Sequence, residues 1–262
     1  MAIQGMQSIT SFYPSRQLLR THLSELSSGK KSVSTTSPAL LAIGQRMLDM
    51  ASTTSVANSN VNFATSRSQT IDSYLQNSSD VISRLKELSV QSANGTLTDV
   101  DREAIDAEAN ELLKGLDLNY HTANFNGQKI LQGGSESVAV TGDGETLNVR
   151  NGDVSRTTLG LEDIDLSTME GATAALDALD DAMDSLGEQR ANVGTDLNTL
   201  EGRYQANMDY ESNLVESGSK LTDVDYAFSS TNLASADIRS QVALAVAAQG
   251  NALQGSMITA LL

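Results

Sequence analysis

Histidine is a common general base and metal ligand in proteins, so the two histidines of this chain are the first residues to examine for chemistry. His22 lies in a segment that we expect to be helical, and His121 lies in a polar segment far along the chain. Neither is accompanied by a cysteine, or by a carboxylate at a spacing that makes a convincing metal site. We therefore predict no catalytic residue, no bound metal and no cofactor.

The other residues that could do chemistry point the same way. The acidic run DALDDAMD, Asp177–Asp184, lacks the spacing and the turn glycine of a calcium-binding loop, and it is typical of the solvated face of a helix. The glycine-containing stretches GGSE and TGDGE are not followed by the Lys-Ser/Thr pair of a phosphate-binding loop. The absence of cysteine excludes disulfides and thiol nucleophiles. The sequence indicates a structural protein and not an enzyme.

The charge of the chain limits its partners. It has 33 acidic and 17 basic residues, a net charge of -16, and residues 133–189 alone contain 13 acidic residues and 2 arginines. Nucleic-acid binding is not expected, because neutralising phosphates needs a basic surface. Membrane insertion is not expected either, because the longest apolar run near the C-terminus is Val242–Ala248 and a span needs roughly 20 apolar residues.

Two long segments carry the heptad pattern of helices that pack along their length. Steps of three and four residues from Leu40 to Leu85 give 14 positions, of which 11 are apolar. The same steps from Leu176 to Leu221 give 14 positions, of which 10 are apolar. The low aromatic content, 4%, favours helices packed through small side chains over a compact core of large rings. We predict a long helix in each segment.

Shorter elements are predicted between these helices. Thr98 is a good N-cap for a helix over residues 99–118, in which Ile105, Leu112 and Leu116 would share a face with Leu113 at its edge. Two short runs around a Gly-Asp-Gly turn predict a β-hairpin at Val138–Val149.

Both ends of the chain are uncharged. No charged residue precedes Arg16, and none follows Arg239. The C-terminal segment has a wide apolar stripe at helical spacing, which a single partner helix from the N-terminus could cover on one face only. We therefore expect other copies of the chain to bury the remaining surface and form a helical polymer. The residues predicted to form this contact are Leu19, Leu23, Leu26, Ile238, Val242, Val246, Leu253, Met257 and Leu261.

Several motifs, in order along the chain, resemble those of one family, the bacterial flagellins. RLKELSVQSAN at Arg84–Asn94 is similar to the flagellin signature R-x-R-E-L-A-V-Q-S-A-N, and NFNGQKIL at Asn124–Leu131 is similar to Q-F-N-G-x-K-x-L. ELSSGKK at Glu25–Lys31 resembles the R-L-S-S-G segment. GDGETLNV, TTLGLED and the C-terminal ALAVAAQGNALQGSMITALL also resemble flagellin segments.

The resemblance implies a mainly α fold, a long antiparallel helical coiled-coil rod with a small β-hairpin and with the N- and C-terminal helices paired. It divides the chain into an inner-layer helix at 1–36, a rod at 37–220 with the hairpin near 138–149, and a second inner-layer helix at 221–262. It implies a secreted subunit of the extracellular flagellar filament, exported by the flagellar type III system. Its partners would be itself, an export chaperone, and the cap and hook-junction proteins. The outer variable domains of many flagellins are expected to be absent.

The chain departs from the family pattern in places. The family usually continues after L-S-S-G with I-N-S-A-x-D-D-A-A-G, whereas this chain reads SVSTTSPALLAIG from Ser32 to Gly44. Pro14 falls where the N-terminal helix should run, so we expect a kink or a late helix start there.

The resemblance also implies a candidate receptor contact. In flagellins recognised by the flagellin-sensing Toll-like receptor, an arginine and a leucine of the signature segment and a glutamate of the next helix make key contacts. By motif match these are Arg84, Leu88 and Glu108. The alternative is that Arg84 is a solvated helix residue and Leu88 a packing residue.

Two other functions fit parts of the sequence. NGTLTDVDREAI also resembles the hook–filament junction proteins, which share the terminal architecture. A monomeric helical binding or adhesin module is the second alternative, but terminal helices without charge argue against it.

Overall fold

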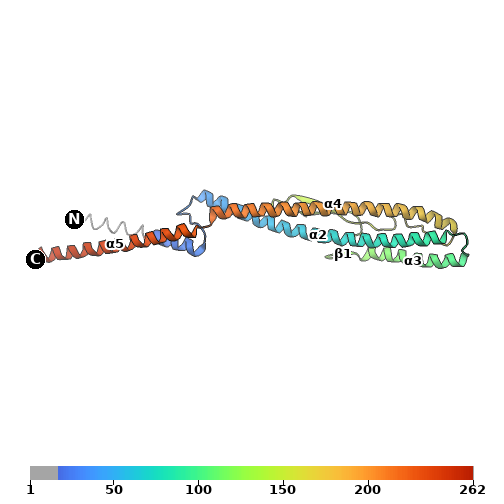
Figure 1. The fold of residues 1–262 in the computed structure, drawn as a ribbon, viewed down its shortest axis with the longest axis horizontal. Helices are drawn as coiled ribbons and strands as arrows, with labels where there is room; N and C mark the ends of the chain where they lie inside the picture. Colours follow the sequence, from blue (N-terminus) through green and yellow to red (C-terminus); the bar gives the residue numbers. More distant parts are fainter. Residues whose placement is uncertain (1–16, 262) are drawn as a thin grey trace. The chain divides into compact units, whose positions relative to one another are not determined.

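The computed structural model describes residues 17–261, although it does not describe the side chains of 247, 251, 254, 255 and 257–261 near the C-terminus. Residues 17–28 are helical. The remaining elements, in chain order, are helix α2 (Pro38–Ser92), helix α3 (Asp99–Thr122), strands β1 (Asn124–Phe125), β2 (Gln128–Lys129), β3 (Ser135–Ala139) and β4 (Thr146–Arg150), and helices α4 (Met169–Thr222) and α5 (Tyr226–Leu261) (Figure 1). The predicted fold class, long helices with a small antiparallel β element, is confirmed.

The chain forms two compact units, which we describe separately. One unit is Ala51–Glu211, and the other combines the described part of Met1–Met50 with Ser212–Leu262. We call the first the middle unit and the second the terminal unit. Helices α2 and α4 are long enough to contribute to both. The position of Pro14 lies outside the described residues, so its predicted effect on the N-terminal helix stays a prediction.

In the middle unit, α2 packs against both α3 and α4 (Figure 1). The pairing of α2 with α4 is antiparallel, because Asp72 binds Arg190 while Lys86, further along α2, binds Asp180. The predicted seam positions Ile71, Leu75, Ile82 and Leu85 of α2 are fully buried, together with Leu179 and Leu186 of α4. The seam of apolar residues therefore forms the core of this unit, as the heptad pattern predicts.

Helix α3 begins at the predicted cap. The Thr98 side chain accepts a hydrogen bond from the Asp101 N–H, and the Asp101 carboxylate accepts one from the Thr98 N–H, which completes a capping box. The buried face differs from the prediction by one residue, because Leu113 is buried with Ile105 and Leu116, whereas Leu112 is only partly buried. Ala109 completes this face four residues after Ile105 and four before Leu113, which is the regular helical spacing.

The predicted hairpin is also present. β3 and β4 pair antiparallel, with Val138 opposite Leu147 and Glu136 opposite Val149. Its apolar side packs onto both long helices through a second core cluster, which contains Val61, Ala64, Val140, Val149 and Leu200. Residues 151–168 then lead from β4 to the start of α4 without a further domain in this part of the chain.

Candidate assembly site at the paired terminal helices

The candidate site is the pair formed by the helix at residues 17–28 and α5, both in the terminal unit. The two helices lie antiparallel: the Tyr226 hydroxyl at the start of α5 donates to the Leu26 carbonyl near the end of the first helix. At the other end of the pair, Leu18 and His22 face Ala236 and Arg239 across a small hollow of about 180 Å³. The pairing of the N- and C-terminal helices that the resemblance implied is therefore seen in the described residues.

A short β-bridge joins the end of the helix at 17–28 to the segment before α5. Lys30 and Asp223 form an isolated antiparallel β-bridge and an ion pair. The hydrogen bond from Lys30 is the main reason why the pKa of Asp223 lies below its ordinary value. The Val224 N–H donates to the Gly29 carbonyl at 2.9 Å. Gly29 adopts a φ of +70°, a left-handed conformation that favours glycine and ends the first helix.

Lys31 ties the same contact to the end of α4. Its N–H donates to the Thr222 carbonyl at 2.7 Å, and its ammonium donates to the Lys220 carbonyl at 2.8 Å. These carbonyls belong to the last turn of α4, where no intrahelical donor is available. A positive charge at this position also favours the negative end of the helix dipole.

One face of α5 is buried and consists of small residues. Ser229, Ala236 and Ser240 are each no more than 8% exposed, and they follow one another at spacings of seven and four residues, which keeps them on one side of a helix. Asn232 and Ala243, partly buried, lie on the same side. Small side chains allow the helix at 17–28 to approach closely, but they bury little apolar area each.

A second face of α5 is exposed and apolar. Ile238, Val242, Val246 and Leu253 are 56–61% exposed, although each has a large aliphatic side chain. They recur at spacings of four, four and seven residues and form one stripe. The side chains of the other two predicted contact residues in this helix, Met257 and Leu261, lie outside the described residues. Among the described residues of α5, no charge interrupts the stripe after Arg239.

The three predicted contact residues of the first helix lie in different environments. Leu23 is 58% exposed, whereas Leu19 and Leu26 are partly buried. The structure thus presents one large aliphatic side chain of this predicted group to solvent. Leu18, which the prediction did not include, is 48% exposed and lines the hollow beside His22.

The three residues predicted to contact a receptor do not form one surface. Arg84 of α2 binds Glu108 of α3 at 2.8 Å and Glu87 of its own helix at 2.8 Å, and all three side chains are exposed. The hydrogen bond to Glu108, followed by that to Glu87, raises the pKa of Arg84 above its ordinary value. Leu88 is only 2% exposed and belongs to the core of the middle unit.

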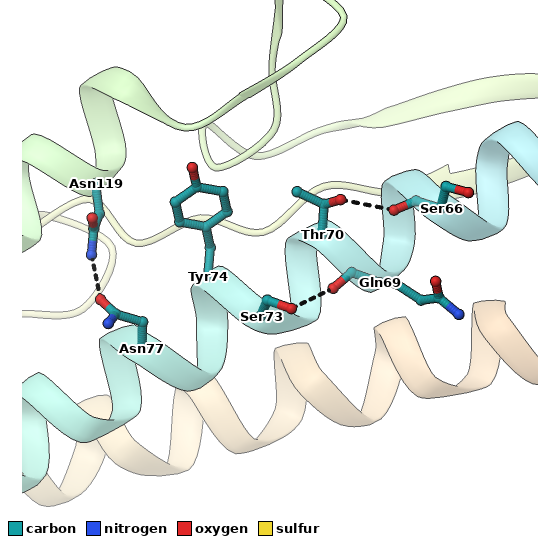
Figure 2. A pocket seen from close by; sticks show the side chains of 7 residues that line it. All are labelled: Ser66, Gln69, Thr70, Ser73, Tyr74, Asn77 and Asn119. Atoms are coloured by element: carbon teal, nitrogen blue, oxygen red, sulfur yellow. Dashed lines mark hydrogen bonds between the residues drawn. The ribbon is translucent and has the colours of Figure 1, made fainter.

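One groove of the described surface is lined by uncharged side chains. A shallow groove of about 440 Å³ is lined by seven residues without formal charge from α2 and α3. Figure 2 shows that Asn77 and Asn119 bind each other there, and that the hydroxyls of Thr70 and Ser73 donate to carbonyls of their own helix. His121 lies elsewhere, exposed, with its ring against Tyr120. No group of three potential metal ligands occurs among the described residues.

Sequence reasoning missed two features of the terminal unit. Glu25 is a buried carboxylate, 3% exposed, although a glutamate in a short amphipathic helix would normally be placed on its wet side. Gly44 of α2 and Gly218 of α4 are buried where these two helices lie close together. Gly218 falls on the predicted seam as one of its non-apolar positions, which was the available signal for a close approach.

No helix in the described part of the chain combines the length and the apolar character needed to cross a membrane.

Comparisons with known proteins agree with this geometry. The model of the bacterial flagellin N-terminal helical region matches residues 2–136, and that of the bacterial flagellin C-terminal helical region matches residues 176–262. The chain is 32% identical to the flagellar filament core protein flaB2 of Brachyspira hyodysenteriae over 236 residues, 83% of each chain.

Two solved structures are similar in fold. The crystal structure of Bacillus cereus flagellin superposes with a TM-score of 0.51 and 25% identity, over 57% of this chain and 88% of that one. A proposed flagellar hook-associated protein from Vibrio parahaemolyticus superposes with a TM-score of 0.59 over 72% of this chain and all of that one, but its identity of 16% shows the fold alone. Taken with the matches to both helical regions, these similarities establish that the chain belongs to the bacterial flagellin family and is a structural subunit of the flagellar filament.

Proposed function

We propose that the chain polymerises by burying the exposed stripe of α5, together with the exposed side chains of the helix at 17–28, against neighbouring copies. The observation that carries this proposal is the row of large aliphatic side chains along α5, each of which is more than half exposed. A soluble protein seldom leaves such a row in water unless another protein covers it.

Burial of the stripe of one α5 helix supplies part of the free energy that assembly needs. Full burial of one valine, leucine or isoleucine side chain contributes about 1.5–3 kcal/mol. Four stripe residues that are already partly covered would therefore contribute on the order of 5 kcal/mol per α5 helix. Association and ordering cost about 4–15 kcal/mol, so each subunit needs contacts with more than one neighbour, as a helical lattice provides.

The proposal also assigns each part of the chain to a layer of the filament. Residues 1–36 and 221–262 would form the inner layer of the filament, and residues 37–220 the rod outside it. The acidic segment at 133–189 would then face solvent, where its charge keeps filaments apart. No catalytic role is proposed for any residue.

Secretion and partners belong to the same proposal. The subunit would be exported by the flagellar type III system with an export chaperone, and would be added to an extracellular filament between cap and hook-junction proteins. Uncharged tails that carry Gln, Asn, Ser and Gly among their apolar residues would be suited to export before they become ordered by contact.

Recognition by a flagellin-sensing Toll-like receptor is proposed only through Arg84 and Glu108. These two side chains are exposed and already held together, so a receptor could bind them without reorganisation. Leu88 is not part of this proposal, because its side chain is only 2% exposed and lies in the core of the middle unit.

Electron microscopy of the purified protein after addition of ammonium sulfate tests the assembly proposal, because sulfate strengthens apolar burial. Full-length protein should form long filaments, and a chain that ends at Arg239 should form none. The variant Val242→Asp should also fail. Val100→Asp should polymerise like the parent, because Val100 lies in α3 of the middle unit and is more exposed than Val242.

Outcomes that contradict the proposal are distinct. If Val242→Asp polymerises as well as Val100→Asp, the stripe is not the contact. If the full chain adds to sheared flagellar fragments only as a short terminal segment, it behaves as a junction protein. If it stays monomeric even with such seeds, a monomeric binding module is the better description.

A further inference from the structure

Glu25 is the most completely buried carboxylate among the described residues, and its surroundings are specific. It lies in the last turn of the helix at 17–28, and its side chain is 3% exposed. Isolated buried charges cost several kcal/mol, so a carboxylate is retained in such a place only where hydrogen bonds compensate it.

Those hydrogen bonds come from the segment that joins this helix to α2. The Ser32 N–H donates to Oε1 of Glu25 at 2.8 Å, and the Thr35 hydroxyl donates to the same oxygen. The second oxygen, Oε2, lies 3.3 Å from Nδ1 of His22, one turn earlier in the helix. The Thr35 N–H donates to the Ser32 carbonyl at 3.1 Å, which closes the segment into a turn.

The carboxylate is stabilised in its charged form. Burial alone would raise the pKa of Glu25, but the hydrogen bonds from Thr35, Ser32 and His22 outweigh it and hold the pKa below its ordinary value. The two lysines that follow the helix are engaged elsewhere, since Lys30 binds Asp223 and Lys31 caps the end of α4. The clamp therefore consists of Glu25 with Ser32, Thr35 and His22.

We propose that Glu25 is a positioning residue for assembly: through Ser32 and Thr35 it sets the direction in which the helix at 17–28 leaves the start of α2, and so presents the terminal helix pair to neighbouring copies. The contacts of Gly29, Lys30 and Lys31 hold the first residues of the segment between 29 and 37. The Thr35 and Thr36 N–H groups donate to the Ser32 carbonyl within the turn itself, and Glu25 ties that turn back to the helix at 17–28. The assembly part of this inference rests on the proposed function.

The surroundings of position 25 suit a carboxylate. The flagellin motif R-L-S-S-G has arginine where this chain has Glu25, and the family's acidic pair after that motif is absent here. The Ser32 N–H and the Thr35 hydroxyl are hydrogen-bond donors, and the Glu25 carboxylate accepts from both. An arginine at position 25 has only donors and could not accept from either group. Glu25 and the segment SVSTTS are thus matched to each other in this chain.

The test compares Glu25→Gln and Thr35→Val with Glu216→Gln. Glu216 is an exposed glutamate of the same unit that binds Lys220 of its own helix, so its substitution also removes one ion pair. Hydrogen exchange of full-length monomer should show peptides covering 29–37 exchanging about tenfold faster or more in the first two variants, since hydrogen bonds to charged groups are the stronger ones. Glu216→Gln should leave this exchange unchanged.

Polymerisation of the same proteins tests the consequence. Glu25→Gln and Thr35→Val should nucleate filaments at least several-fold more slowly than the parent, and the double variant should be no slower than the slower single variant, because both remove one clamp. Unchanged exchange over 29–37 in Glu25→Gln would overturn the clamp. Faster exchange with unchanged polymerisation would overturn its role in assembly, and a parent protein that fails to polymerise would instead count against the proposed function.

Discussion

The close packing of α2 against α4 at Gly44, in the terminal unit, predicts the effect of adding a methyl group there. A Cβ added at Gly44 would lie 2.6 Å from Cγ2 of Thr222 and 2.9 Å from Cβ of Leu221. Cγ2 of Thr222 could turn away, but the Leu221 Cβ is attached to the backbone and cannot. Since carbon atoms pack at about 3.5–4.0 Å, Gly44→Ala must push the two helices apart by more than half an ångström.

The size of the effect follows from two opposed terms. Alanine is a better helix former than glycine by about 1 kcal/mol, which would stabilise α2. Overpacking a tight contact costs about 1–3 kcal/mol, and the separated helices also lose dispersion contacts along the seam. We expect Gly44→Ala to destabilise the terminal unit by roughly 1–2 kcal/mol net.

The matched control is Gly202→Ala in α4, where nothing lies within 4 Å of the added carbon. There only the helix term acts, so this variant should be stabilised by about 0.5–1 kcal/mol. Urea unfolding of the monomers, followed by circular dichroism, gives the sign, and hydrogen exchange over residues 38–50 reports the terminal unit itself. If Gly44→Ala stabilises the protein as Gly202→Ala does, the close approach described here is not real.

Three further predictions follow from the other contacts. Leu75→Ala should destabilise the middle unit by about 2–5 kcal/mol in urea unfolding, because Leu75 is fully buried in the α2 seam; a loss below 1 kcal/mol would contradict that packing. Arg102→Met should lower the free energy of unfolding by about 1–3 kcal/mol, because the buried Arg102 guanidinium donates to the carbonyls of Ser92, Asn94 and Leu97 before α3. A variant as stable as the parent would show that these carbonyls need no donor. Because the pKa of Glu25 is lowered, its contribution to stability is fully present above the ordinary carboxyl pKa of 4.5. That contribution is lost as the pH falls through the pKa of Glu25 in the folded protein, so the rate of hydrogen exchange over 29–37 should rise on acidification of the parent. A parent profile as flat as that of Glu25→Gln would refute this.

Much of the fold could be predicted from the sequence because it depends on local periodicity. The heptad steps through Leu75 and Leu179 predicted the long helices, since each step of three or four residues returns to the same side of a helix. The cap at Thr98 and the hairpin around Gly-Asp-Gly are also local, because their partners lie within a few residues. The uncharged ends and the family motifs pointed to the flagellin family for the same reason: they can be read along the chain.

The tertiary structure decided which residues meet across long separations. Periodicity could not choose between Leu112 and Leu113, because the two lie side by side and only packing against α2 decides which is buried. It could not show that Gly44 faces Gly218. It also could not show that the side of α5 made of small residues is buried while Val242 and Val246 are exposed. The burial of Glu25 was hidden as well, because a carboxylate is expected in water unless specific donors surround it, and those donors are supplied by the turn that follows the helix. Local patterns therefore determined the helices of this protein, whereas the matching of surfaces from distant parts of the chain determined its helix contacts and its exposed stripe.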